Sequence, residues 1–197
     1  MTYQETLDYL FVQVPMFQNL GAGAYKPGLD TTLKLAAHFG NPHRELTCIH
    51  VGGTNGKGST ASTLAAVLQA AGYRVGLYTS PHLMDFRERI RVDGETVSKE
   101  FVVDFVAEYL ASPALTALSP TFFELTTIMA FSWFASRNVD VAVIEVGLGG
   151  RLDCTNIITP VLSVITNISL DHTALLGDSE ELIASENIVS PEVMLAM

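Results

Sequence analysis

The stretch that decides the fold runs from residue 47 to residue 64 and reads TCIHVGGTNGKGSTASTL. Its apolar start predicts a buried strand, its four glycines predict a tight turn, and the small and hydroxyl residues after them predict a helix. Glycines let backbone N–H groups converge on a phosphate without a Cβ in the way, and a helix N-terminus adds unpaired donors and a partial positive charge. Lys57 adds a full positive charge. The stretch therefore predicts a binding site for phosphate groups.

The loop differs from the common P-loop pattern GxxxxGK[ST], since Val51 stands where the first glycine belongs and Gly58 follows Lys57 in place of serine or threonine. This difference disfavours an ordinary P-loop kinase or NTPase, and a glycine-rich turn with a solvated lysine is the structural alternative. We favour a nucleotide site, because strand, glycines, lysine, hydroxyls and helix come in the order that phosphate binding needs. The expected phosphate contacts are Asn55, Gly56, Lys57, Gly58, Ser59 and Thr60.

The rest of the chain alternates short β-branched runs with longer helical stretches, which is the pattern of βαβ units. Near-continuous apolar runs are typical of parallel strands covered on both faces. Such runs occur at Thr47–Val51, Val75–Thr79, Val139–Val146 and Val161–Asn167. Helices are predicted over residues 60–71, 99–110 and 124–137. The sequence therefore predicts an α/β fold, with a parallel sheet of the P-loop type and helices on both faces.

Three parts are predicted along the chain. Residues 1–45 are expected to be helical, with a glycine-rich interruption at 21–30, and to pack on a phosphate-binding domain at residues 46–186. Within that domain, residues 89–97 carry an Asp-Gly pair between alternating residues, which predicts a β-hairpin. Residues 187–197 form a tail that departs from the pattern of the rest.

The composition excludes several classes of protein. With 48% apolar and 16% charged residues the chain is typical of a globular protein, and its net charge of −10 argues against a surface that neutralises a nucleic-acid backbone. No stretch approaches the roughly 18 apolar residues of a membrane span. The first residues, MTYQETLDYL, do not resemble a secretory signal. Two cysteines without metal-ligand spacing argue against zinc and favour the cytoplasm.

Polar side chains follow three of the predicted strands at the point where each strand ends. Ser80 follows the second strand, Glu145 lies near the end of the third, and Asp171 and His172 come after the fourth. Because ligands of an open parallel sheet gather at the carboxyl ends of its strands, we expect these side chains near the phosphate loop. A carboxylate there is a usual ligand of Mg²⁺, so Glu145 is the predicted metal ligand. The structural alternatives are turn roles for Glu145 and Ser80 and a backbone-bonded ring for His172.

The strings GTNGKGS at residues 53–59 and TSPHL at 79–83 resemble the folylpolyglutamate synthase and dihydrofolate synthase family, a branch of the Mur ligase superfamily. The resemblance runs from YKPGLD at residue 25 to about residue 186. It implies the central-domain fold of the Mur ligases and an ATP-dependent amide ligase that joins L-glutamate to a folate or dihydropteroate carboxylate through an acyl phosphate. It further implies that Ser80, Glu145 and His172 together coordinate a Mg²⁺ that bridges the phosphates of ATP.

Two further segments are expected to contact the substrate. In TFFELTTIMAF, at residues 121–131, Thr121 and Glu124 have the spacing of a capping box at the start of a helix. The resemblance implies that this segment touches a pterin, so that Phe122 and Phe123 line a slot for a flat ring together with the two capping residues.

The second of these segments is GLGGRLDCTN, at residues 147–156, which is expected on the same rim as Glu145. Arg151 offers a planar fork for carboxylate or phosphate and is the predicted clamp on the acyl phosphate or its precursor. The alternative for Arg151 is a solvated residue paired with Asp153. The predicted substrate contacts here are Leu152, Asp153 and Cys154, and the predicted catalytic residues of the whole site are Lys57, Glu145, Arg151 and His172.

The three arginines of FRERIRV, which are Arg87, Arg89 and Arg91, are expected on one face of a strand because they recur at period two. A solvated face is the favoured interpretation, although the resemblance places this segment near the substrate.

The sequence departs from the family in two places. Family members are much longer, and their second domain helps to close the ATP site; this chain contains no counterpart of it, and we expect such a domain to dock here. Asn187 stands at the position of a lysine that the family carbamylates to hold a second Mg²⁺, so that metal site is not expected. The ligase hypothesis therefore predicts weak or no turnover by this chain alone. A nucleotide-binding module without catalysis is the second hypothesis.

Overall fold

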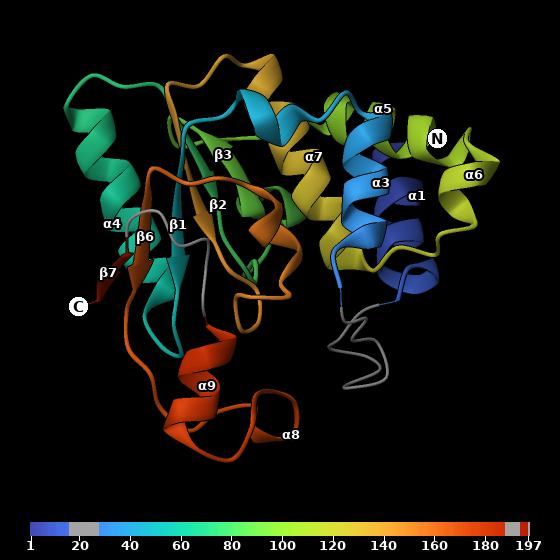
Figure 1. Ribbon diagram of the computed structural model, residues 1–197. Helices are drawn as coiled ribbons and strands as arrows, with labels where there is room; N and C mark the ends of the chain where they lie inside the picture. Colours follow the sequence, from blue (N-terminus) through green and yellow to red (C-terminus); the bar gives the residue numbers. More distant parts are fainter. Residues whose placement is uncertain (16–27, 188–193, 197) are drawn as a thin grey trace.

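The computed structural model describes residues 1–15, 28–187 and 194–196, and within them the chain forms one sheet between layers of helices (Figure 1). The strands lie in the order β4-β3-β2-β5-β1-β6-β7. Their bounds are β1 Cys48–Gly52, β2 Val75–Tyr78, β3 Ile90–Val92, β4 Glu95–Thr96, β5 Val141–Glu145, β6 Leu162–Ile165 and β7 Met194–Ala196. β2, β5, β1, β6 and β7 pair in parallel, and β3 and β4 form an antiparallel hairpin at one edge. The predicted parallel sheet is confirmed, with the hairpin as an antiparallel addition.

Helices cover both faces of the sheet, as predicted. α4 (Lys57–Ala70) lies on one face, and α7 (Phe122–Ser136) lies on the other, together with α1 (Tyr3–Asp8), α3 (Asp30–His38) and α5 (Lys99–Leu110) (Figure 1). The shorter elements are η1 Tyr9–Gln13, η3 Pro42–Glu45, η4 Phe86–Arg89, α6 Pro113–Thr116, η5 Cys154–Ile157, α8 Thr173–Leu176 and α9 Glu180–Glu186.

The alternation of side chains along the strands divides the core into two parts. In β5, Val141 and Val143 pack in the cluster that contains residues of α4, whereas Ala142 and Ile144 pack in the larger cluster that contains α7. All four side chains are buried. Burial of one valine or isoleucine side chain contributes about 1.5–3 kcal/mol relative to its exposure. Both faces of the strand are covered, which explains why its sequence is a continuous apolar run.

The starts of the helices depend on local signals. α4 begins at Lys57, three residues before the predicted start at Thr60, because Gly56 adopts a left-handed φ of +81° that turns the chain directly into the helix. α7 begins after the predicted capping box, which is confirmed: Thr121 Oγ1 accepts from the N–H of Glu124 at 3.2 Å, and the Glu124 carboxylate accepts from the N–H of Thr121 at 2.7 Å. α5 has the predicted bounds.

The predicted hairpin is also confirmed, since β3 and β4 are joined at Asp93 and Gly94, both with positive φ. Near the N-terminus, Leu10 and Leu35 are fully buried in the core cluster of α7. Most of the glycine-rich interruption lies outside the described residues, as does most of the tail, and the domain boundaries stay a prediction. Among the helices that the structure describes, none has the length and apolar character needed to cross a membrane.

Candidate active site

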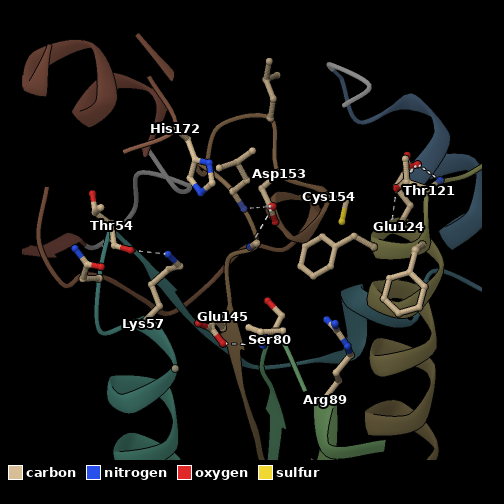
Figure 2. A pocket seen from close by; sticks show the side chains of 18 of the residues that line it. Thr54, Lys57, Ser80, Arg89, Thr121, Glu124, Glu145, Asp153, Cys154 and His172 are labelled. Carbon is tan, nitrogen blue, oxygen red and sulfur yellow. Dashed lines mark hydrogen bonds between the residues drawn. The ribbon is translucent and has the colours of Figure 1, made fainter. Parts of the chain in front are cut away.

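A cavity of about 920 Å³ lies where the parallel strands β1, β2 and β5 end (Figure 2). It is the place that the strand-end argument predicts. Most of the predicted site residues line it: Asn55, Gly56, Lys57, Gly58, Ser59, Ser80, Thr121, Phe122, Phe123, Glu124, Glu145, Leu152, Asp153, Cys154 and His172. Thr60 and Arg151 are not among the lining residues. The structure therefore brings the phosphate loop, the strand-end acid and the aromatic segment to one cavity.

The phosphate loop presents unpaired donors to this cavity. The N–H groups of Gly56, Gly58 and Ser59 have no hydrogen-bond acceptor in the described part of the chain, as expected for the start of a helix. The Lys57 Nζ donates to the carbonyl of Gly53 at 2.8 Å and to that of Thr54 at 3.0 Å, and Figure 2 shows the second of these bonds. An ammonium group carries three N–H bonds, so Lys57 keeps one donor for a phosphate oxygen. The arrangement is suited to an anion.

The segment after β6 fixes the loop from outside. The backbone N–H of Thr54 donates to the carbonyl of Asn167 at 2.9 Å, and that of Asn55 donates to Asn167 Oδ1 at 2.8 Å. Asn55 can therefore offer a phosphate its side chain but not its backbone N–H. Gly53 has a φ of +120°, and a Cβ there would lie 2.3 Å from Thr166 Oγ1, so this close approach requires glycine.

Asn187 reaches the same loop from α9. Its Oδ1 accepts from the N–H of Gly53 at 3.2 Å, and its Nδ2 donates to the carbonyl of Ile183 at 2.8 Å. The residue is buried. Asn187, which replaces the lysine of the second metal site in the family, therefore joins α9 to the phosphate loop.

Glu145 ends β5 as a buried carboxylate. Its Oε2 accepts from the N–H of Ser80 at 2.9 Å, so it bonds to the end of β2 and not to the glycine turn that follows it. Burial raises the pKa of Glu145, and the Ser80 N–H and the charges of Lys57 and Arg89 oppose that rise. A Cβ at Gly58 would lie 3.4 Å from both carboxylate oxygens, so glycine leaves space in front of them. Glu145 therefore lines the cavity beside the phosphate loop.

The predicted metal ligands Ser80 and His172 line the same cavity as Glu145. His172 precedes α8 with a φ of +47°, and its Nε2 lies 3.8 Å from Asp171 Oδ2. The described residues contain no group of three or more His, Cys, Asp or Glu side chains arranged to hold a metal ion. One carboxylate, one hydroxyl and one imidazole suit Mg²⁺ only when phosphate oxygens and waters complete its coordination. The donors fit that case, and their roles stay a prediction.

The aromatic end of the cavity is built on the start of α7. The Phe123 ring stacks on Tyr78 with 5.7 Å between centroids, and a Cβ at Gly147 would lie 2.3 Å from that ring. Glu124 is held by structural contacts, since its Oε2 serves the capping box and its Oε1 accepts from Thr32 Oγ1 at 3.2 Å. The capping role of Glu124 is therefore sufficient to explain it. Phe123 is the partly exposed ring at this end of the cavity, whereas Phe122 lines the cavity but is buried against Phe11 and Phe86.

Asp153 organises the loop after β5. Its Oδ2 accepts from the N–H groups of Gly147 at 3.1 Å and Leu148 at 3.0 Å, and its Oδ1 accepts from the N–H of Thr155 at 3.0 Å and from the Thr155 hydroxyl. The Thr155 hydroxyl also bonds to the buried His50 Nε2 at 2.8 Å. Burial raises the pKa of Asp153, and these donors oppose the rise. Asp153 is a buried scaffold, so the alternative that pairs it with Arg151 at the surface is wrong.

The structure does not bring Arg151 to the cavity. Its side chain is half-exposed and pairs with Glu186 of α9 at 2.7 Å. The physical reason is that Asp153 draws the loop inward through the Gly147 and Leu148 N–H groups, which leaves Arg151 on the outside. Cys154 does line the cavity, with its Sγ 3.2 Å from Thr127 Oγ1. Burial raises the pKa of the Cys154 thiol, which keeps it neutral.

Comparison with known proteins agrees with this geometry. The family model described as the Mur ligase middle domain matches residues 51–189. The chain belongs to the Mur ligase family. A dihydrofolate synthase/folylpolyglutamate synthase of Bacillus subtilis is 44% identical over 168 residues, which cover 82% of this chain and 39% of that protein.

Two solved structures extend the comparison. An FPGS-AMPPCP-folate complex has a TM-score of 0.85 and 42% identity, over 95% of this chain and 45% of that one. E. coli FolC in complex with DHPP and ADP has a TM-score of 0.82 and 39% identity, over 95% of this chain and 43% of that one. The predicted family resemblance is confirmed, and the Mur ligase chain described here spans less than half of the length of each of these relatives.

Arg89 of this Mur ligase chain lines the cavity, which the spacing of the arginines does not predict. The three arginines of FRERIRV do not share a strand face, because residues 86–89 form the short helix η4 and only Arg91 lies in β3. A capping box between Asp85 and Glu88 starts that helix and breaks the period of two. Arg89 is buried and lines the cavity, so the expectation of a solvated face is wrong for it. The D-x-x-E spacing before the strand is the signal that could have indicated this.

Proposed function

We propose that the chain supplies the ATP- and substrate-binding domain of a ligase that joins L-glutamate to the carboxylate of a folate or a dihydropteroate. The observation that carries the proposal is the single cavity in which the phosphate loop, Glu145 and the phenyl rings of Phe122 and Phe123 meet. It offers anion donors at one end and a surface for a flat ring at the other. Its likeness to complexes that hold AMPPCP, ADP, folate and DHPP supports this pair of ligands.

In the proposed reaction, a carboxylate oxygen of the substrate attacks the γ-phosphorus of ATP, and the bond from that phosphorus to the β–γ bridging oxygen breaks. The products of this step are an acyl phosphate and ADP. The amine of L-glutamate then attacks the acyl carbon, phosphate leaves, and the nitrogen loses a proton, so that an amide forms. Both steps depend on orientation and on neutralising phosphate charge. Lys57 and the N–H groups at the start of α4 are the proposed groups for both tasks.

The proposal assigns Mg²⁺ to Ser80, Glu145 and His172 on the cavity wall. The ion would offset the charge of the phosphates when bound. Residues 46–186 would form the ATP-binding domain, with residues 1–45 packed on it and a second domain docked at the cavity to supply the remaining contacts. Two free, buried cysteines support a cytoplasmic setting.

The experiment is a calorimetric titration of the chain with AMPPCP and Mg²⁺, followed by pteroate. We expect both ligands to bind, and the second to bind in the presence of the first. Failure of both titrations would contradict the proposal. If each ligand binds alone but one prevents the other from binding, the two do not occupy the cavity together as proposed.

A nucleotide-binding module without catalysis is the second candidate. It is favoured by Asn187, which stands at the position of the carbamylated lysine and is already occupied by bonds to Gly53 and Ile183. Incubation of the chain with ATP, Mg²⁺, dihydropteroate and L-glutamate separates the two candidates. Amide product supports the ligase, and nucleotide binding without phosphate release or product supports the module.

A further inference from the structure

Arg89 is a buried cation at the wall of the cavity. It ends η4 and is 3% exposed. Its Nε donates to His82 Nδ1 at 2.8 Å, and its guanidinium carbon lies 5.1 Å from the centroid of the Phe122 ring. Figure 2 shows the guanidinium group directed toward the interior of the cavity. One edge of the guanidinium is therefore fixed by the protein, and the other faces the space where a ligand would lie.

Arg89 forms no ion pair with an acid in the described part of the chain, although the charge of Glu145 acts on it at longer range. Arg87, two residues earlier, pairs with Asp85 at 2.8 Å, and Arg151 pairs with Glu186 at 2.7 Å. Arg89 has no carboxylate at ion-pair distance, and its two Nη atoms have no hydrogen-bond acceptor among the described residues. An unpaired buried charge costs free energy. Such a cost is offset when an anionic ligand binds.

The position of Arg89 selects the kind of anion. It lies against Phe122 at the aromatic end of the cavity, and its charge also acts on Glu145 at the phosphate end. The acidic group of a ligand whose flat ring lies at the aromatic end would therefore meet Arg89 before it meets the phosphate loop. The planar fork of a guanidinium matches the two oxygens of a carboxylate.

We propose that Arg89 binds the carboxylate of an aromatic acid in this cavity, and that His82 is the positioning residue that holds the guanidinium in place. The identity of the acid as a pterin-containing one rests on the proposed function, whereas the carboxylate site does not. When that acid is the substrate, Arg89 holds the group that receives the phosphate. His82 fixes the Arg89 guanidinium through its Nδ1, which accepts from Arg89 Nε at 2.8 Å.

The test compares two ligands that differ in one group. We measure the binding of pteroate and of the matching pterin–aniline compound, which lacks the carboxylate. The proteins are the wild-type chain, Arg89→Gln and Arg87→Gln. The affinity of each protein for ADP is measured separately. The wild type should prefer pteroate by roughly tenfold or more, because hydrogen bonds to charged groups are the stronger ones. Arg89→Gln should lose this preference and keep its affinity for ADP. Arg87→Gln, whose guanidinium is paired with Asp85, should retain both.

Three results would overturn the assignment. Arg89→Gln could keep the preference for pteroate, it could weaken both pterin ligands equally, or it could weaken ADP as much as pteroate. The last result would make Arg89 a phosphate contact. If Arg89→Gln does not fold, Arg89→Lys is tested in its place. An unchanged preference for pteroate in Arg89→Lys would contradict a carboxylate bound by the planar guanidinium of Arg89.

A simpler pair of ligands separates this inference from the proposed function. If the wild-type chain binds no pteroate, 4-aminobenzoate and aniline are titrated at millimolar concentration. A preference for 4-aminobenzoate that disappears in Arg89→Gln would keep the carboxylate site while the pterin assignment fails. No preference in the wild type would overturn the site itself.

Discussion

The two ends of the cavity are built in different ways. The phosphate end comes from one contiguous stretch, residues 53–59, between β1 and α4, with support from the segment after β6. The aromatic end combines residues that are far apart in the chain, such as Thr32, Arg89, Phe122 and Cys154. The anion donors therefore come from local sequence, held in place by Asn167 and Asn187, whereas the site for the flat ring is itself assembled by tertiary packing. Substitutions should affect the two ends separately, except where one residue supports both.

The largest effect is expected from Lys57→Ala, which removes the cation of the phosphate end. Nucleotide affinity should fall by at least roughly thirtyfold, about 2 kcal/mol, because the phosphates lose a charged partner. Affinity for pteroate in the absence of nucleotide should be unchanged. Calorimetric titration of both ligands checks the result, with the exposed Lys34→Ala as the matched control. Equal loss of both affinities would remove the distinction between the two ends.

Asp153→Asn tests the loop that supports both ends. Each carboxylate oxygen of Asp153 accepts from two donors, so an amide in its place leaves either the Gly147 and Leu148 N–H groups or the Thr155 N–H and hydroxyl without their acceptor. An unpaired buried donor costs about 1–3 kcal/mol, and we expect the free energy of unfolding to fall by at least that amount. Chemical denaturation measures it. A variant as stable as the wild type would show that Asp153 does not organise the loop.

Glu145 should make Mg²⁺ binding depend on pH. Its pKa lies above the ordinary value of 4.5, and only the ionised carboxylate can ligate the ion, so affinity should be complete at high pH and fall as the pH drops through the raised pKa. The loss of Mg²⁺ affinity should therefore begin at a higher pH than it would for a carboxyl group with the ordinary pKa of 4.5. Titrations of Mg²⁺ with ADP present, at several pH values, measure it. Glu145→Gln should bind the ion weakly at every pH. If that variant keeps the pH dependence of the wild type, the dependence arises from another group.

Cys154→Ala should have the smallest effect. It replaces one small buried side chain by another and removes a weak contact with Thr127, so the free energy of unfolding should fall by about 1 kcal/mol or less. Affinities for nucleotide and pteroate should change little. Loss of pteroate binding would instead place the thiol in direct contact with the ligand.

The contrast between the two ends also explains what the sequence could predict. The strands, α4, the capping box at Thr121 and the hairpin follow from periodicity and local hydrogen bonds, so their prediction succeeds. The sequence predicts Arg151 at the cavity and Arg89 on a solvated face, whereas Arg89 lines the cavity and Arg151 does not. The difference arises from how Asp153 folds its loop and from how the Asp85 capping box turns the chain. Neither effect is visible in a count of charges or in a period of two.

The most direct test of the account is a crystal structure of the chain with AMPPCP, Mg²⁺ and pteroate. We predict the phosphates at the N–H groups of residues 56–59 and the pterin at Phe122 and Phe123, with both ligands in the one cavity. A nucleotide bound elsewhere, or a cavity that accepts one ligand only when the other is absent, would contradict the account.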